Sequence, residues 1–176
     1  LKILKSKENL RLIDSSKITF NEIWKFNSVD NFTLIQSEDR KIFSKNDFRI
    51  VSKKKPNKSQ LDNLMFAFNV CRYAKSNAIV LASNKSTVGI GSGQPSRLDS
   101  CEIAIDKMNK FSKIKNDIVA ASDAFFPFVD GVEKLVQSGV SAIIQPAGSI
   151  RDKEIIKFAN ETNTVLIFSK TRHFRH

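Results

Sequence analysis

The stretch SDAFFPFVDG, residues 122–131, combines the residue types of a ligand site most densely. It crowds three phenylalanines around Pro127 and places an aspartate toward each end. Rings spaced in this way match neither a helix face nor a strand face, and a bend cannot easily bury them. We therefore treat this stretch as a candidate ligand loop.

Two further stretches could bind an anion or a polar group. GIGSG (89–93) precedes Arg97 at the expected start of a helix, and a helix N-terminus beside an arginine suits an anion. GxxxxGK[ST] and the full GxGxxG spacing are absent, so the alternative is a glycine turn that allows close backbone approach. PAGSIRDKE (146–154) is either a helix start capped by Ser149 or a set of free amides facing a ligand.

The remaining candidates are the histidines and cysteines. RHFRH (172–176) holds both histidines, and one beside arginines could act as an acid or base near neutral pH. The alternative is a solvated basic tail. Cys71 and Cys101 are expected to be buried free thiols, which favours the cytoplasm. Neither CxxC spacing nor an HxE motif is present, so we expect no metal site.

Hydrophobic periodicity predicts the elements that position these residues. Residues 1–55 read as a β-rich connecting segment, and residues 56–176 alternate helices and strands. This alternation predicts a layered α/β sheet. The expected strands are 10–13, 32–36, 48–52, a hairpin of 78–83 and 87–93, 117–121, 140–145 and 164–168; the expected helices are 59–73, 96–111, 130–138 and 150–160.

The ends of these strands indicate where a ligand would bind. In open α/β sheets, ligands gather at the loops that leave the carboxyl ends of the strands. That rule selects Ser122–Asp130, Pro146–Ser149 and Ser169–His176.

Composition narrows the class of protein. The 176 residues, 41% hydrophobic and 27% charged, fit a soluble globular chain of one domain or two small lobes. Its apolar runs are too short to cross a membrane, and its charged N-terminus does not resemble a signal peptide. A net charge of +11 admits nucleic acid or small anions as partners, but most lysines are scattered over expected surface positions.

Four stretches together resemble one enzyme family: KSNAIVLASNKSTVGIGSGQPSR, SDAFFPFVDGVE, GVSAIIQPAGSIRD and RHFRH, in this order. From about Leu10 to His176 the sequence resembles the C-terminal part of the bifunctional purine biosynthesis enzymes. These join phosphoribosylaminoimidazolecarboxamide (AICAR) formyltransferase to inosine monophosphate (IMP) cyclohydrolase. The resemblance implies a cytidine-deaminase-like lobe of a homodimer with shared sites. It also implies formyl transfer from 10-formyltetrahydrofolate to AICAR, giving FAICAR, without a catalytic metal.

The resemblance also implies residue roles. Asn77 would be catalytic, at the reacting amine and carboxamide, and Arg172 would bind the nucleotide's phosphate. The implied AICAR set is Asn77, Arg97, Phe125, Arg172 and Phe174, and the implied folate set is Leu98, Asp130, Ser149 and Ile150. Within the candidate loop, Phe126 and Phe128 are then expected to pack in the core, and Asp123 to hold the turn.

One departure from the family pattern matters. The family's proton-transfer pair, a lysine and a histidine in KHxNPCG, is absent from these residues, as are the cyclohydrolase domain and the first transformylase lobe. We therefore expect a fragment that is inactive alone. The alternative is a basic RNA- or protein-binding domain. The ordered motifs favour the enzyme, with neither a nucleic-acid nor a membrane partner.

Overall fold

The structure is a computed structural model that describes residues 4, 6, 9–17, 24–41, 43–113 and 116–175. The chain forms two compact units, Leu1–Arg40 and Lys41–His176. Residues 48–50 form a strand of the second unit's sheet. No helix in these described ranges is long and apolar enough to cross a membrane.

The first unit contains an antiparallel hairpin of β1 (Trp24–Val29) and β2 (Phe32–Ser37). Asp30 turns the chain with a positive φ of 53°, a conformation that aspartate tolerates better than most residues. The strand predicted at 32–36 is confirmed. The strand predicted at 10–13 is wrong, because these residues pair with no strand in the described part of the chain.

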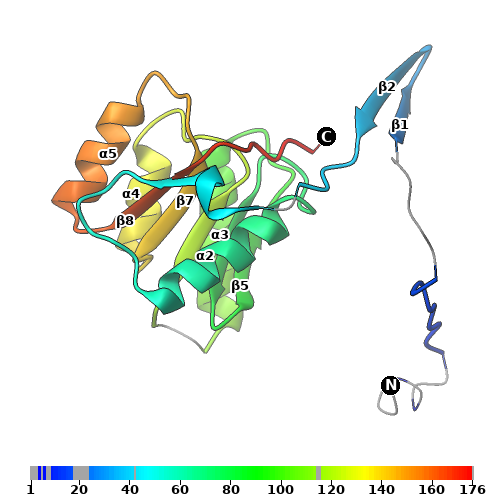
Figure 1. Ribbon diagram of the computed structural model, residues 1–176, viewed down its shortest axis with the longest axis horizontal. Helices are drawn as coiled ribbons and strands as arrows, with labels where there is room; N and C mark the ends of the chain where they lie inside the picture. Colours follow the sequence, from blue (N-terminus) through cyan, green and yellow to red (C-terminus); the bar gives the residue numbers. More distant parts are fainter. Residues whose placement is uncertain are drawn as a thin grey trace. The chain divides into compact units, whose positions relative to one another are not determined.

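The second unit is built on a six-stranded mixed sheet in the order β3-β8-β7-β6-β4-β5 (Figure 1). Its strands are β3 (Phe48–Ile50), β4 (Ile79–Ser83), β5 (Ser86–Gly91), β6 (Val119–Ser122), β7 (Ala142–Pro146) and β8 (Val165–Ser169). β6, β7 and β8 run parallel, whereas β3 is antiparallel to β8 and β4 is antiparallel to β6 and β5. The predicted layered α/β sheet is confirmed.

Helices cover both faces of this sheet. The helices are α2 (Lys58–Cys71), α3 (Arg97–Phe111), α4 (Asp130–Gln137) and α5 (Asp152–Glu161). α2 contributes to one apolar cluster with Val80 and Ala82, and the other three helices contribute to a second with Ile79 and Leu81. Successive β4 residues thus pack on opposite faces, as a strand's period of two requires. Strands buried on both faces read as continuous apolar runs, which AIVLA does.

The helix starts show where the expected caps were misplaced. α2 begins with a capping box in which Asn57 Oδ1 accepts from the Gln60 amide (2.8 Å) and Gln60 Oε1 accepts from the Asn57 amide (3.1 Å). The helix predicted from Ser59 therefore starts slightly earlier. Ser149 does not cap α5. The helix starts at Asp152, whose carboxylate accepts from the amides of Gly148 and Ser149.

The GIGSG stretch has a packing role. A Cβ on Gly89 would lie 2.1 Å from the Ala104 carbonyl oxygen, and one on Gly91 would lie 1.9 Å from that of Ser100. Only glycine allows α3 to approach β5 so closely. The close-approach alternative is confirmed at these two positions.

Candidate functional site

The loops selected from the sequence leave the same edge of the sheet. The parallel strands β6, β7 and β8 end there, at Ser122, Pro146 and Ser169. β4 runs the opposite way and pairs Ile79 with Ser122, so the segment that carries Asn77 enters the sheet at this edge. Residues distant in sequence are brought together because parallel strands present their carboxyl ends side by side.

A pocket of about 420 Å³ opens at this edge. Seven of the nine predicted site residues line it: Asn77, Arg97, Leu98, Phe125, Asp130, Arg172 and Phe174. Ser149 and Ile150 do not line it. They lie on the loop after β7, where Ile150 is fully exposed. This loop nevertheless reaches the pocket, because the guanidinium of Arg151 lies 5.0 Å from the ring centre of Phe128, a lining residue.

Two of the lining residues, Asn77 and Arg97, belong to a polar cluster that we call the inner cluster. It consists of the half-buried Asn77 and the buried side chains of Ser76, Arg97, Ser122 and Asp123. Arg97 Nη1 donates to Ser122 Oγ (2.8 Å) and forms an ion pair with the Asp123 carboxylate. Its Nη2 donates to Asn77 Oδ1 (2.8 Å). The side chains of Arg97 and Asp123 are 7% and 0% exposed, so this ion pair is largely removed from water.

The Asn77 amide is held from both ends. Its Nδ2 donates to the carbonyls of Gln94 (3.0 Å) and Pro95 (2.9 Å), which uses both amide hydrogens. The main-chain carbonyl of Asn77 accepts from Ser100 Oγ at 2.8 Å. The side-chain oxygen Oδ1 accepts from Arg97 and keeps one further acceptor position that no described residue fills. This asparagine is therefore arranged to accept a hydrogen bond at the pocket, not to donate one.

Asp123 is the member of the inner cluster whose role the sequence reasoning missed. We expected it to hold the turn, and it instead neutralises Arg97 in the interior. The available signal was its place directly after the buried strand VAAS, where an ionised side chain needs a partner of opposite charge. Which of the chain's many cations supplies that charge cannot be read from spacing.

Three of the lining residues form an aromatic wall, namely Phe125, Phe128 and Phe174. The Arg172 guanidinium lies 4.1 Å from the ring centre of Phe174 and 5.7 Å from that of Phe125. Arg172 is exposed, and it forms no ion pair with any described residue. Cation–π contacts orient a guanidinium but do not neutralise it, so its charge faces the pocket.

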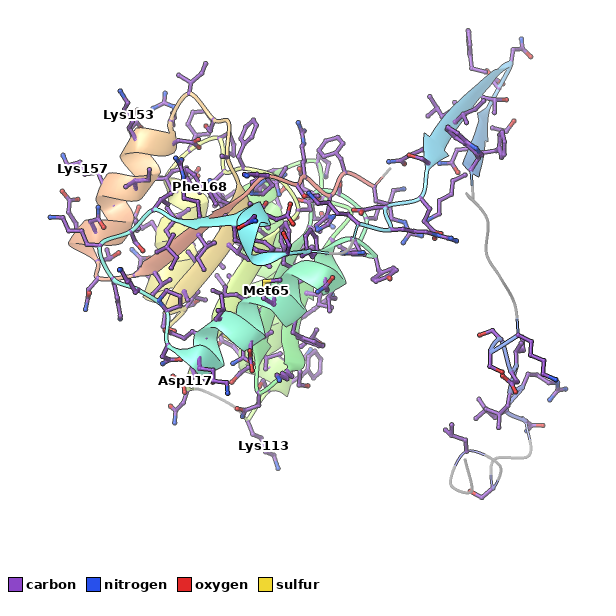
Figure 2. The ribbon with its side chains drawn as sticks, viewed as in Figure 1. Met65, Lys113, Asp117, Lys153, Lys157 and Phe168 are labelled. Atoms are coloured by element: carbon purple, nitrogen blue, oxygen red, sulfur yellow. The ribbon has the colours of Figure 1, made fainter. Side chains whose placement is uncertain are left out.

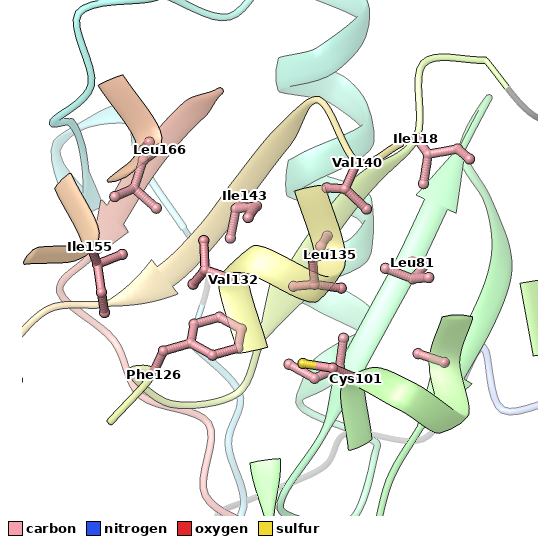
Figure 3. Packing of buried hydrophobic residues seen from close by; sticks show 14 of the residues in the cluster. Leu81, Cys101, Ile118, Phe126, Val132, Leu135, Val140, Ile143, Ile155 and Leu166 are labelled. Atoms are coloured by element: carbon pink, nitrogen blue, oxygen red, sulfur yellow. The ribbon is translucent and has the colours of Figure 1, made fainter. Parts of the chain in front are cut away.

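The phenylalanines of the candidate loop divide differently from the expectation. Phe126 is 1% exposed and packs close to Val132 and Cys101, as predicted for a core residue (Figure 3). Phe128 was expected beside it, but it is 51% exposed and lines the pocket. The physical reason is the turn at Pro127, after which the chain leaves the core to begin α4 at Asp130.

His173 lies apart from the pocket. It is 1% exposed, and its ring centre is 4.4 Å from that of Phe68 and 5.4 Å from that of Phe43. This aromatic packing makes it a core residue, so the acid–base candidate and the solvated-tail alternative both fail at this position. His176, the other histidine, lies outside the described residues.

Neither thiol lines the pocket, and neither do two lysines of α5. Burial raises the pKa of Cys101 to about 12 and that of Cys71 well above its usual value, so both stay protonated. No group of three or more His, Cys, Asp or Glu side chains suited to a metal occurs among the residues described. Lys153 and Lys157 of α5 project away from the sheet, into solvent (Figure 2).

Comparisons with known proteins place the chain in a family. The family model described as AICARFT/IMPCHase bienzyme matches residues 1–107. The chain belongs to this family.

Curated relatives agree with that membership. Proteins called bifunctional purine biosynthesis protein PurH are 42% identical over 176 residues in Chlorobium phaeobacteroides (strain BS1) and 44% identical over 174 residues in Polynucleobacter asymbioticus. They match 100% and 99% of this chain but 34% and 33% of the relatives, so the chain spans about a third of their length. A solved dCMP deaminase from the cyanophage S-TIM5, in apo form, is 12% identical with a TM-score of 0.41. That match covers 64% of this chain and 98% of that one.

Proposed function

We propose that this chain supplies the substrate-binding part of an AICAR formyltransferase. The enzyme would transfer the formyl group of 10-formyltetrahydrofolate to AICAR and give FAICAR, which the full-length protein would cyclise to IMP. One observation carries the proposal. A single pocket collects seven of the nine residues that the family resemblance implies, from segments as distant as Asn77 and Phe174.

The charges of the pocket suit a nucleotide. Arg97 is neutralised by Asp123, whereas the Arg172 guanidinium lies on aromatic faces. In the proposal, Arg172 binds the dianionic phosphate of AICAR, because a guanidinium fork matches phosphate oxygens and gains most when no carboxylate competes. Phe125, half-buried and lining the pocket, then packs against the imidazole base.

A second part of the pocket suits a pterin. Asp130, at the start of α4, is exposed and lines the pocket near Leu98 and Phe128. A flat pterin needs apolar walls and a carboxylate that accepts from its amino-pyrimidine edge. Ser149 and Ile150, on the adjoining loop, would contact the folate once it extends past Phe128.

Asn77 would position the nucleophile in this mechanism. Because its amide hydrogens are donated to Gln94 and Pro95, its free acceptor position on Oδ1 would bind an N–H of the AICAR amine or carboxamide. Holding the amine against the formyl carbon lowers the entropic part of the barrier. A different group would donate to the tetrahedral oxyanion.

The proposed activity belongs to the longer protein. We propose a cytoplasmic homodimer with shared sites, in which residues outside this chain supply the lysine–histidine pair.

Calorimetric titration of the full-length protein with AICAR tests the assignment. Arg172→Met should weaken AICAR binding about tenfold to a hundredfold, because it removes charge-assisted hydrogen bonds to the phosphate. The matched control Lys153→Met, which removes a cation on the solvent side of α5, should leave affinity unchanged. Unchanged affinity in Arg172→Met, or no AICAR binding by the unmodified protein, would contradict the proposal.

A further inference from the structure

Asp123 contacts two parts of the site, which we call its first and second arms. The first is Arg97, and the second is the C-terminal segment that carries Arg172. We propose that Asp123 is the positioning residue of the pocket, and that it sets the direction of Arg97 and the placement of the segment that carries Arg172. This inference rests on the proposed function in one respect only, namely that the ligand is AICAR.

The first arm is the ion pair. One carboxylate oxygen of Asp123, Oδ1, accepts from Arg97 Nη1, which also donates to Ser122 Oγ. With Nη1 held in this way, the planar guanidinium presents Nη2 to Asn77 Oδ1 at 2.8 Å. The proposed nucleophile-binding amide is thus oriented through Arg97 by a carboxylate that does not itself line the pocket.

The second arm reaches the C-terminal segment. The other carboxylate oxygen, Oδ2, accepts from Ser76 Oγ at 2.6 Å. Ser76 in turn exchanges two hydrogen bonds with Arg175, from the Arg175 amide to Oγ (3.1 Å) and from the Ser76 amide to the Arg175 carbonyl (2.9 Å). The main-chain carbonyl of Asp123 accepts from the His173 amide at 2.9 Å.

These bonds fix the chain on either side of the pocket residues. His173 and Arg175 are anchored to Asp123 and Ser76, and Arg172 and Phe174 are their immediate neighbours. Chain termini are usually poorly ordered unless they are tied down. The anchors therefore hold the Arg172 guanidinium over the aromatic rings, where it meets the ligand.

Stability alone does not explain a charge pair at this depth. Removing two charges from water costs free energy that their attraction barely offsets, and apolar pairs of similar size are often no less stable. What the ion pair supplies is direction and charge balance. With Arg97 neutralised, Arg172 is the uncompensated cation among the described lining residues, which directs a phosphate to one end of the pocket.

Chemical modification of the ligand-free, full-length protein tests the first arm. Phenylglyoxal labelling with peptide mass mapping should find Arg97 slow in the unmodified protein and at least about tenfold faster in Asp123→Asn. The matched control Asp106→Asn changes an exposed carboxylate on α3, the helix that carries Arg97, and should leave the Arg97 rate unchanged. An unchanged Arg97 rate in folded Asp123→Asn would overturn the inference, whether or not AICAR binds.

Ser76→Ala tests the second arm while keeping the ion pair. Amide exchange at Arg175 should accelerate at least about tenfold, and labelling of Arg97 should stay slow. Unchanged exchange at Arg175 would show that the C-terminal segment is not held through Ser76, and it would overturn this arm.

A double-mutant cycle on AICAR affinity separates positioning from general destabilisation. Asp123→Asn should weaken binding about tenfold. In an Arg97→Gln background, the same change should weaken binding less than about threefold, because only the contact through Ser76 is left for it to disturb. Additive losses in folded variants would overturn the inference. Absence of AICAR binding in the unmodified protein would instead refute the ligand assignment and leave the labelling result standing.

Discussion

The inner cluster and the aromatic wall differ in how their polar groups are satisfied. In the inner cluster, each carboxylate oxygen of Asp123 has a hydrogen-bond partner and the Arg97 charge is matched. Along the aromatic wall, Arg172 lies over the exposed ring of Phe174 and is itself exposed. The buried, paired Arg97 holds a geometry, and the exposed Arg172 is available to a ligand. The two arginines of one pocket thus have different roles: Arg97 is structural, and Arg172 is available to a ligand.

The largest expected difference comes from the same substitution at both arginines. Arg97→Met should lower the free energy of unfolding by about 3–5 kcal/mol, because Asp123 would stay buried without its cation. Arg172→Met should change it by less than about 0.5 kcal/mol, as expected for an exposed side chain. Urea titrations measure both values, and equal losses would break the comparison.

The phenylalanines provide the second contrast. Phe126→Ala should cost about 3–5 kcal/mol, because it leaves a cavity beside Val132 and Cys101. Phe125→Ala should cost less than half of that, since the ring is only half-buried, and it should weaken AICAR binding. Urea unfolding and calorimetry on the same two variants measure these effects. If Phe126→Ala weakened binding more than Phe125→Ala in folded protein, their assignment to core and pocket would be reversed.

Gly131 tests how tightly α4 packs against the buried ring of Phe126. A Cβ at this position would lie 2.9 Å from two ring atoms of Phe126, so Gly131→Ala must displace that ring. Overpacking of this kind costs about 1–3 kcal/mol. Gln137→Ala, on the exposed face of the same helix, should stay within about 0.5 kcal/mol in the same unfolding assay. Equal values would mean that the ring adjusts freely.

The smallest expected effect concerns the buried thiol of Cys101. Burial raises the pKa of Cys101 to about 12 from a usual value of 9.0, so the unfolded thiol ionises first as pH rises. Its contribution to stability is therefore complete below pH 9 and is lost as pH rises toward 12. Iodoacetamide at pH 8 should label Cys101 only in urea. Labelling at the same rate in the folded protein would show that the core around Cys101 is open to solvent.

Local pattern predicted the elements well where a strand or helix buries one continuous apolar face. β4 and β8 are apolar except for a final serine, and they were placed within a residue or two. The hairpin strand β1 was missed because its residues, WKFNSV, mix polar and apolar types without a buried face, and all but one are exposed. The expected caps failed for a similar reason. Asn57 and Ser59 are both good cap residues, and only the bond to Gln60 selects between them.

The sequence by itself determined the family, the alternation of strands and helices, and the loops that carry the site. These follow from ordered motifs and from periodicities that the backbone imposes locally. Tertiary structure decided which arginine is neutralised, which phenylalanine is exposed and what Asp123 holds. Those outcomes depend on burial, and burial is set by segments remote in sequence, such as the C-terminal residues that bond to Ser76 and Asp123.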